Sequence, residues 1–142
     1  MSAAIVVGTD FSETASRALE QAVSLAATLH ADVVCVHAWE DAPAMPLRDD
    51  PTPGFEAQLQ QAVAASGAHE RGVAVVTVVR RGRPWEKLLN VASDVGACLI
   101  VVGATGERNA CPQLGLGTVT ARLTALSTRL VLIVPSSTVA VP

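Results

Sequence analysis

The sequence predicts an α/β fold in which a parallel sheet carries helices on both faces. Short runs of β-branched and other apolar residues alternate along the chain with segments of helical period. Four of the apolar runs are nearly continuous, as strands buried on both faces should be. The chain has 142 residues, of which 50% are hydrophobic and 16% charged, which is enough for one domain with its own core. We therefore expect a single domain over residues 1–142.

The first part of the chain is expected to form a strand, a helix and a second strand. Residues 4–8 and 32–39 are apolar runs of strand length. Between them, apolar side chains recur at helical spacing, and Ser12 is placed to cap the start of the helix. The inward positions of this helix are Ala18, Ala22, Leu25 and Leu29.

A loop, a helix and a strand are expected in the middle of the chain. Residues 40–53 hold four of the eight prolines, so they are expected to form a loop rather than a regular element. A helix is expected over residues 54–71, ended by Gly72. The strand 73–80 follows it. The inward positions of the helix are Phe55, Leu59 and Val63.

The remainder of the chain alternates helix, strand, helix, strand. Pro84 in a first turn and Gly96 after the last turn mark the third helix. A strand over residues 98–102 leads into a glycine-containing loop, a fourth helix over 117–127 and a last strand over 130–134. The inward positions of the two helices are Trp85, Leu88, Leu89, Ala92, Val95, Val119, Leu123 and Leu126.

Composition argues against several classes of protein. The formal net charge is −3, from 10 Lys and Arg against 13 Asp and Glu, so we expect no nucleic acid partner and no anionic membrane surface as partner. The apolar runs are far shorter than the roughly 20 residues of a membrane helix. The amino terminus has no basic segment before its first apolar run, so a cytoplasmic location is expected.

The three cysteines do not show the number or spacing of a disulfide framework or a zinc site. Cys35, Cys98 and Cys111 are odd in number and show no C-x-x-C spacing. We expect reduced, buried thiols rather than disulfides or a zinc site. Cys111 falls in the glycine-containing loop, where a redox role is a minor alternative.

Ligands of open α/β sheets bind beyond the carboxyl ends of the strands, where the strand order reverses. The first expected strand is followed by Thr9-Asp10-Phe11-Ser12, and the fourth by a loop that contains several glycines and opens the last helix. Glycines let the backbone approach a ligand, and free N–H groups at a helix start suit a phosphate. The sequence contains neither a P-loop nor a G-x-G-x-x-G after the first strand.

These residues resemble the universal stress protein family. The likeness runs from residues 5–13 to residues 130–135 and includes Gly82-Arg83-Pro84. The nucleotide-binding branch of that family carries G-x2-G-x9-G-[ST]. Gly103, Gly106 and Gly117-Thr118 match this motif, except that ten residues separate Gly106 from Gly117.

The resemblance implies an open five-stranded parallel sheet in the order 3-2-1-4-5, in a Rossmann-like fold similar to the adenine nucleotide alpha hydrolases. It also implies that ATP, together with Mg²⁺, binds across the switch between strands one and four. Asp10 would then lie near the ribose and the backbone of Ala38 beside the adenine, with the glycines and the start of the last helix around the phosphates. The candidate nucleotide-binding residues are Thr9, Asp10, Ala38, Gly103, Gly106, Arg108, Gly117, Thr118 and Val119.

The function implied is that of an ATP-binding regulator or stress-protective factor with at most slow ATP hydrolysis. Phosphoryl transfer needs several charge-stabilising groups, and the loop supplies only Arg108, with Glu107 beside it. Two alternatives stay open. One is a family member that binds no nucleotide and acts through its dimer surface, which the extra loop residue favours. The other is an adenine-nucleotide hydrolase or transferase on a related fold, which would need a general base or metal ligands.

A homodimer is expected through the last strand, residues 130–134. This apolar run would be a sheet edge in the implied order, and an unpaired hydrophobic edge invites association. The family resemblance points to antiparallel pairing of this strand across a two-fold axis.

Structural roles compete with functional ones at three positions. Asp10 has an alternative role in capping the following helix, although Ser12 already fits that role. His37 is interpreted as packed or hydrogen-bonded rather than catalytic, because no nucleophile with an orienting acid is found beside it. Trp39 is placed to line a ligand cleft, but packing is the more common role of an aromatic residue at a strand end.

Overall fold

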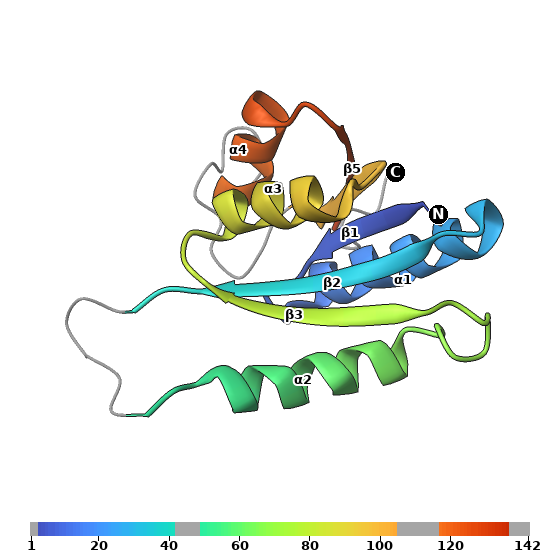
Figure 1. Cartoon of the computed structure of the whole chain (residues 1–142), viewed down its shortest axis with the longest axis horizontal. Coiled ribbons are helices and arrows are strands. Elements are labelled where there is room, and N and C mark those ends of the chain that lie inside the picture. Colours follow the sequence, from blue (N-terminus) through green and yellow to red (C-terminus); the bar gives the residue numbers. More distant parts are fainter. Residues whose placement is uncertain (1–2, 42–48, 105–116, 137–142) are drawn as a thin grey trace, which may run out of the picture.

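The computed structural model describes residues 3–41, 49–104 and 117–136, in which strands and helices alternate (Figure 1). All strand pairs are parallel, and the sheet order is β3-β2-β1-β4-β5. The predicted fold class and strand order are therefore confirmed. The elements are β1 (Ala4–Gly8), α1 (Glu13–Leu29), β2 (Asp32–Trp39), α2 (Thr52–Ala65), β3 (Val75–Arg81), α3 (Pro84–Val95), β4 (Leu99–Gly103), α4 (Thr118–Leu126) and β5 (Leu130–Val134).

The order of the strands reverses next to β1. From β1 the chain moves outward through β2 to β3, then returns across the sheet to β4 and continues to β5 at the other edge. Val6 at the centre of β1 pairs with Val34 of β2 on one side and with Ile100 of β4 on the other. The carboxyl ends of β1 and β4 therefore lie side by side at the point where connections leave the sheet in opposite directions.

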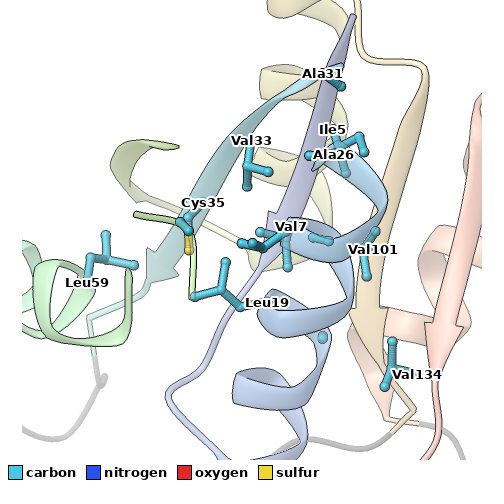
Figure 2. Close-up of a cluster of buried hydrophobic side chains, with 14 residues drawn as sticks. Ile5, Val7, Leu19, Ala26, Ala31, Val33, Cys35, Leu59, Val101 and Val134 are labelled. Carbon is cyan, nitrogen blue, oxygen red and sulfur yellow. The ribbon is translucent and has the colours of Figure 1, made fainter. Parts of the chain in front are cut away.

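Each face of the sheet has its own hydrophobic core, because side chains alternate along the strands. Ile5 and Val7 of β1 pack in the core that α1 and α2 cover. Val6, between them, packs in the core that α3 and α4 cover on the opposite face. Figure 2 shows the first core, with Leu19 of α1 and Leu59 of α2 directed toward the strands. The helices thus cover both faces, as predicted.

The expected helix starts and stops are confirmed at three positions. The hydroxyl of Ser12 accepts a hydrogen bond from the backbone N–H of Ala15 at 3.2 Å and caps α1. Pro84 is the first residue of α3, and Gly96 ends that helix with a φ of +63°.

Within the described ranges, no helix has the length and apolar character needed to cross a membrane.

The second helix begins at Thr52, two residues earlier than predicted and within the predicted loop 40–53, and it is shorter than predicted. It ends at Ala65, because the backbone N–H of Ser66 turns back to the carbonyl oxygen of Val63 at 3.1 Å and its hydroxyl donates to the same oxygen at 2.6 Å. Gly72 therefore ends a turn rather than the helix, and β3 begins two residues later than expected.

Four apolar residues expected inside the protein are exposed. Leu29, Val95 and Leu126 are each the last residue of a helix, where the helix has passed the edge of the core beneath it. Cys98 precedes β4, which begins at Leu99, and it is exposed, so its predicted burial is wrong. The helical period predicts the direction of a side chain, but not whether the core extends far enough to cover it.

Candidate functional site

A cavity of about 490 Å³ lies at the carboxyl ends of β1 and β4. Its walls come from the ends of β1, β2 and β4 and from the starts of α1, α3 and α4. This volume falls within the range of small-molecule sites, and the position is where an open α/β sheet is expected to bind a ligand.

Most of the predicted site residues line this one cavity. Gly106 and Arg108 lie outside the described residues, as does Cys111. The predicted residues that line the cavity are Thr9, Asp10, Ala38, Gly103, Gly117, Thr118 and Val119.

Local hydrogen bonds shape the β1–α1 loop, residues 9–12, around Asp10. The backbone N–H of Ser12 donates to Oδ1 of Asp10 at 2.9 Å, and that of Phe11 donates to Oγ1 of Thr9 at 3.0 Å. Phe11 has a φ of +66°, which is uncommon for a residue other than glycine. Asp10 thus helps to order the loop before α1, whereas the bond that caps the first turn of the helix is made by Ser12. A carboxylate has several acceptor positions, so this bond is compatible with a role toward a ligand.

The start of α4 lines the cavity, and the backbone N–H groups of its first turn have no side-chain cap. Gly117 is the N-cap and has no side-chain oxygen to satisfy the first turn. Its own N–H donates to the carbonyl oxygen of Ala104 at 2.8 Å. The amides of Thr118 and Val119 come next, in the first turn, where intrahelical partners are lacking and the helix dipole is positive.

Gly103 has a packing role that the sequence did not indicate. A Cβ atom at this position would lie 2.6 Å from Cγ2 of Thr14, so only glycine lets α1 approach the end of β4 this closely. Gly8 at the end of β1 is similar, since its Cβ would lie 2.8 Å from Cδ1 of Leu88 on the other face. Both glycines line the cavity and also permit close helix packing.

Thr120 is a lining residue that sequence reasoning missed. It is buried, and its hydroxyl donates to the carbonyl oxygen of Gly103 at 2.6 Å, which ties the first turn of α4 to the end of β4. No local sequence pattern marks this contact, because it joins residues 17 positions apart in the chain.

Three further lining residues, Glu40, Arg83 and Trp85, were also not predicted. Glu40 follows β2 on the same side as Ala38, as the period of a strand requires. Arg83 and Trp85 follow β3 at the start of α3. The rule that ligands bind beyond strand ends would have found these two, had it been applied to the third strand as well as to the others.

His37 and Trp39 point to the opposite side of the sheet from Ala38. The Nδ1 atom of His37 lies 2.8 Å from the carbonyl oxygen of Thr9. The ring of Trp39 lies 6.3 Å from that of Phe55, and the guanidinium of Arg81 stands 5.5 Å from the Trp39 ring. Both are packed residues, as interpreted from the sequence, and neither lines the cavity.

Comparison with known proteins identifies similar chains. A sequence model described as the universal stress protein family matches residues 1–135. The universal stress protein YxiE of Bacillus subtilis (strain 168) is 40% identical over 67 residues, which are 47% of this chain and 45% of YxiE. This alignment therefore spans less than half of that relative.

Solved structures are similar over nearly the whole chain. A universal stress protein in complex with cAMP is 29% identical, with a TM-score of 0.73 and coverage of 93% of this chain and 96% of that chain. A universal stress protein family member from Burkholderia pseudomallei is 29% identical, with a TM-score of 0.64 and coverage of 94% and 96%. A universal stress protein from Archaeoglobus fulgidus, at 23% identity, covers 94% of each chain with a TM-score of 0.71 and shares the fold.

Proposed function

Because the chain belongs to the universal stress protein family, we propose that it binds an adenine nucleotide, namely ATP with Mg²⁺, in the cavity at the carboxyl ends of β1 and β4. The observation that carries this proposal is the convergence of the β1–α1 loop, the end of β2, the end of β4 and the start of α4 on one cavity. The similar structure that contains cAMP supports an adenine nucleotide as the ligand class.

Each part of the nucleotide has a matching group on the cavity wall. The Asp10 carboxylate accepts hydrogen bonds from ribose hydroxyls, and the backbone of Ala38 pairs with the edge of the adenine. The N–H groups at the start of α4, from Thr118 and Val119, bind phosphate oxygens with help from the helix dipole. Gly106 and Arg108 complete the proposed site from the residues that the structure does not describe.

The oxygen donors of the cavity suit Mg²⁺. This ion is commonly held by nucleotide phosphates, water and one or two protein oxygens rather than by a complete protein cage. The hydroxyl of Thr118 at the start of α4 is the protein donor that fits this role beside the phosphates, while the carboxylate of Asp10 serves the ribose. The bound ion would neutralise part of the phosphate charge.

We propose that the nucleotide acts as a regulatory or protective ligand, with at most slow hydrolysis. Among the described lining residues the charged side chains are Asp10, Glu40 and Arg83, so they offer one positive charge to a phosphoryl group. Fast phosphoryl transfer relies on several positive groups placed around the transferred phosphate. Contacts that are equal in the ground and transition states give binding without acceleration.

The proposal also includes a homodimer and a cytoplasmic location. β5 is an edge strand whose partner among the described strands is β4, and Leu130 at its start is 75% exposed. An apolar edge of this kind favours association with a second copy. Cys35 and Cys98 are free thiols, which suits a reducing compartment.

The test is to identify the nucleotide that purified protein releases on heating, and then to titrate nucleotide-free protein with ATP in a calorimeter. We expect an adenine nucleotide and saturable ATP binding, with turnover well below about 10 per second. No binding of ATP, ADP, AMP or cAMP would favour the nucleotide-free family member, which the ten-residue spacing between Gly106 and Gly117 favours. Rapid hydrolysis would favour the hydrolase alternative.

A further inference from the structure

His37 holds the peptide of Thr9 at the point where the chain leaves β1 for the cavity. Its Nδ1 atom lies 2.8 Å from the carbonyl oxygen of Thr9. A carbonyl oxygen can only accept, so Nδ1 carries the proton and donates it to this bond. The N–H of Thr9 donates to the carbonyl oxygen of Val36 at 2.9 Å. Both backbone polar groups of Thr9 are therefore bound to neighbouring residues of β2.

Two aromatic rings hold His37 in place. Its ring centroid lies 4.5 Å from that of Phe11 in the loop and 4.4 Å from that of Phe55 in α2. His37 is 8% exposed and faces the α1 and α2 side of the sheet, whereas Ala38 lines the cavity. His37 therefore does not line the cavity itself, and its printed contacts reach the cavity through the β1–α1 loop.

The loop that His37 contacts has an uncommon backbone conformation. Phe11 adopts a φ of +66°, which for a bulky residue costs energy and persists only where surrounding contacts enforce it. Within the loop, the bonds to the side chains of Thr9 and Asp10 supply part of that enforcement. His37 adds two contacts from outside the loop, one to the Thr9 carbonyl and one to the Phe11 ring.

From this geometry we infer that His37 is a positioning residue of the nucleotide site: by binding the Thr9 carbonyl and packing against Phe11, it keeps Asp10 on the cavity wall. This inference rests on the proposed function. It assigns His37 no contact with the ligand and no proton transfer. A donor at the Nδ1 position is the feature that matters.

Replacement of His37 tests the role of the donor. His37→Leu fills similar space without a donor, whereas His37→Asn places an amide N–H near the position of Nδ1. We expect His37→Leu to weaken ATP binding about tenfold in calorimetry, because the loop of the free protein then holds its binding geometry only about a tenth of the time. His37→Asn should recover most of this loss. Exchange of the Phe11 and Ser12 amides should be faster in His37→Leu and slower again in His37→Asn.

A second variant and a control keep the result interpretable. Phe55→Leu loosens the far side of the His37 ring and should weaken ATP binding about threefold. Because Phe55 lies outside the cavity lining, this loss would not come from a contact with the ligand. Val34→Ala removes buried volume from β2 on the α3 and α4 face. It should lower the melting temperature and leave ATP affinity unchanged.

The outcomes separate this inference from the proposed function. Wild-type protein that binds no nucleotide overturns the proposed function, and the positioning role falls with it. Wild-type protein that binds ATP, with unchanged affinity in His37→Leu and in Phe55→Leu, overturns the positioning role alone. The same holds if His37→Asn binds no better than His37→Leu, or if Val34→Ala weakens binding as much as His37→Leu does.

Discussion

Alanine at Gly103 should destabilise the protein through α1 rather than through the ligand. The added Cβ would lie 2.6 Å from Cγ2 of Thr14, 3.3 Å from its Cβ and 3.4 Å from its backbone carbon. Thr14 belongs to α1, and its short β-branched side chain has few other rotamers. Because its Cβ and backbone carbon also lie close to the added atom, relief of the contact requires a shift of the helix away from the end of β4 as well.

The size of this effect follows from the cost of overpacking. Extra methyl groups in close-packed regions typically cost about 1–3 kcal/mol. With an unfolding entropy of about 2.1 cal/mol/K per residue, the 142-residue chain should lose roughly 3 °C of melting temperature for each kcal/mol. We expect a decrease of about 3–10 °C for Gly103→Ala in the absence of nucleotide.

A double-mutant cycle with Thr14→Ser identifies the cause. Serine removes Cγ2, the atom nearest to the added Cβ, and leaves contacts of 3.3 and 3.4 Å that a small shift absorbs. In thermal or urea unfolding, Gly103→Ala should cost clearly less in the Thr14→Ser background than alone. Gly54→Ala is the matched control, since a Cβ there meets nothing within 4 Å. Equal costs in the two backgrounds would refute this explanation of Gly103.

Three further predictions concern single groups. Burial raises the pKa of the Cys35 thiol to about 12, so at neutral pH peptide mapping should find Cys98 alkylated and Cys35 modified only after unfolding. Gly117→Val adds a side chain at the start of α4 and should reduce ATP affinity at least tenfold by calorimetry, with an unchanged circular dichroism spectrum. Leu130→Lys should shift sedimentation toward the monomer, whereas Val76→Lys on the opposite edge strand should not, although Val76 is also exposed.

The same raised pKa makes stability depend on pH in the alkaline range. The ordinary value for the thiol is 9.0, and the folded protein keeps its proton up to about pH 12. Unfolded chains release this proton above about pH 9, so the stabilisation is complete below that value and is lost as the pH rises toward 12. Cys35→Ala should flatten this part of the pH profile of the unfolding free energy, and an unchanged profile would contradict the assignment.

Much of the fold was predictable from local patterns. Short, nearly continuous apolar runs predict the strands, and the start of α1 follows from the chemistry of Ser12. The order of the strands did not follow from these patterns and came from the family resemblance. Where the prediction was wrong, as at Leu29 and Cys98, the missing information was how far the core extends beyond the end of an element.

The candidate site was predictable where it follows strand ends and not where it depends on contacts across the chain. Asp10 follows the apolar run of β1 within two residues, and Gly117 directly precedes α4. Both elements were predicted from their own sequences. The hydrogen bond between Thr120 and Gly103 and the ring contacts of His37 join segments that only the folded chain brings together. The residues in such contacts are not separated by a fixed, short number of positions, so no sequence motif includes them.

Gly103 and Gly117, the two glycines of the nucleotide-binding motif that lie within the described residues, differ in how strongly they indicate a ligand. Gly103 is needed for the approach of α1 whether or not a nucleotide is present. Gly117 has a φ of −74° and a ψ of 167°, a conformation open to any residue. Its backbone geometry therefore gives no reason for glycine, and the reason that we propose is the close approach of a ligand to the start of α4. A family member that had lost its nucleotide would be expected to keep glycine at position 103 and to be free to change it at position 117, so Gly117 is the more informative of the two positions.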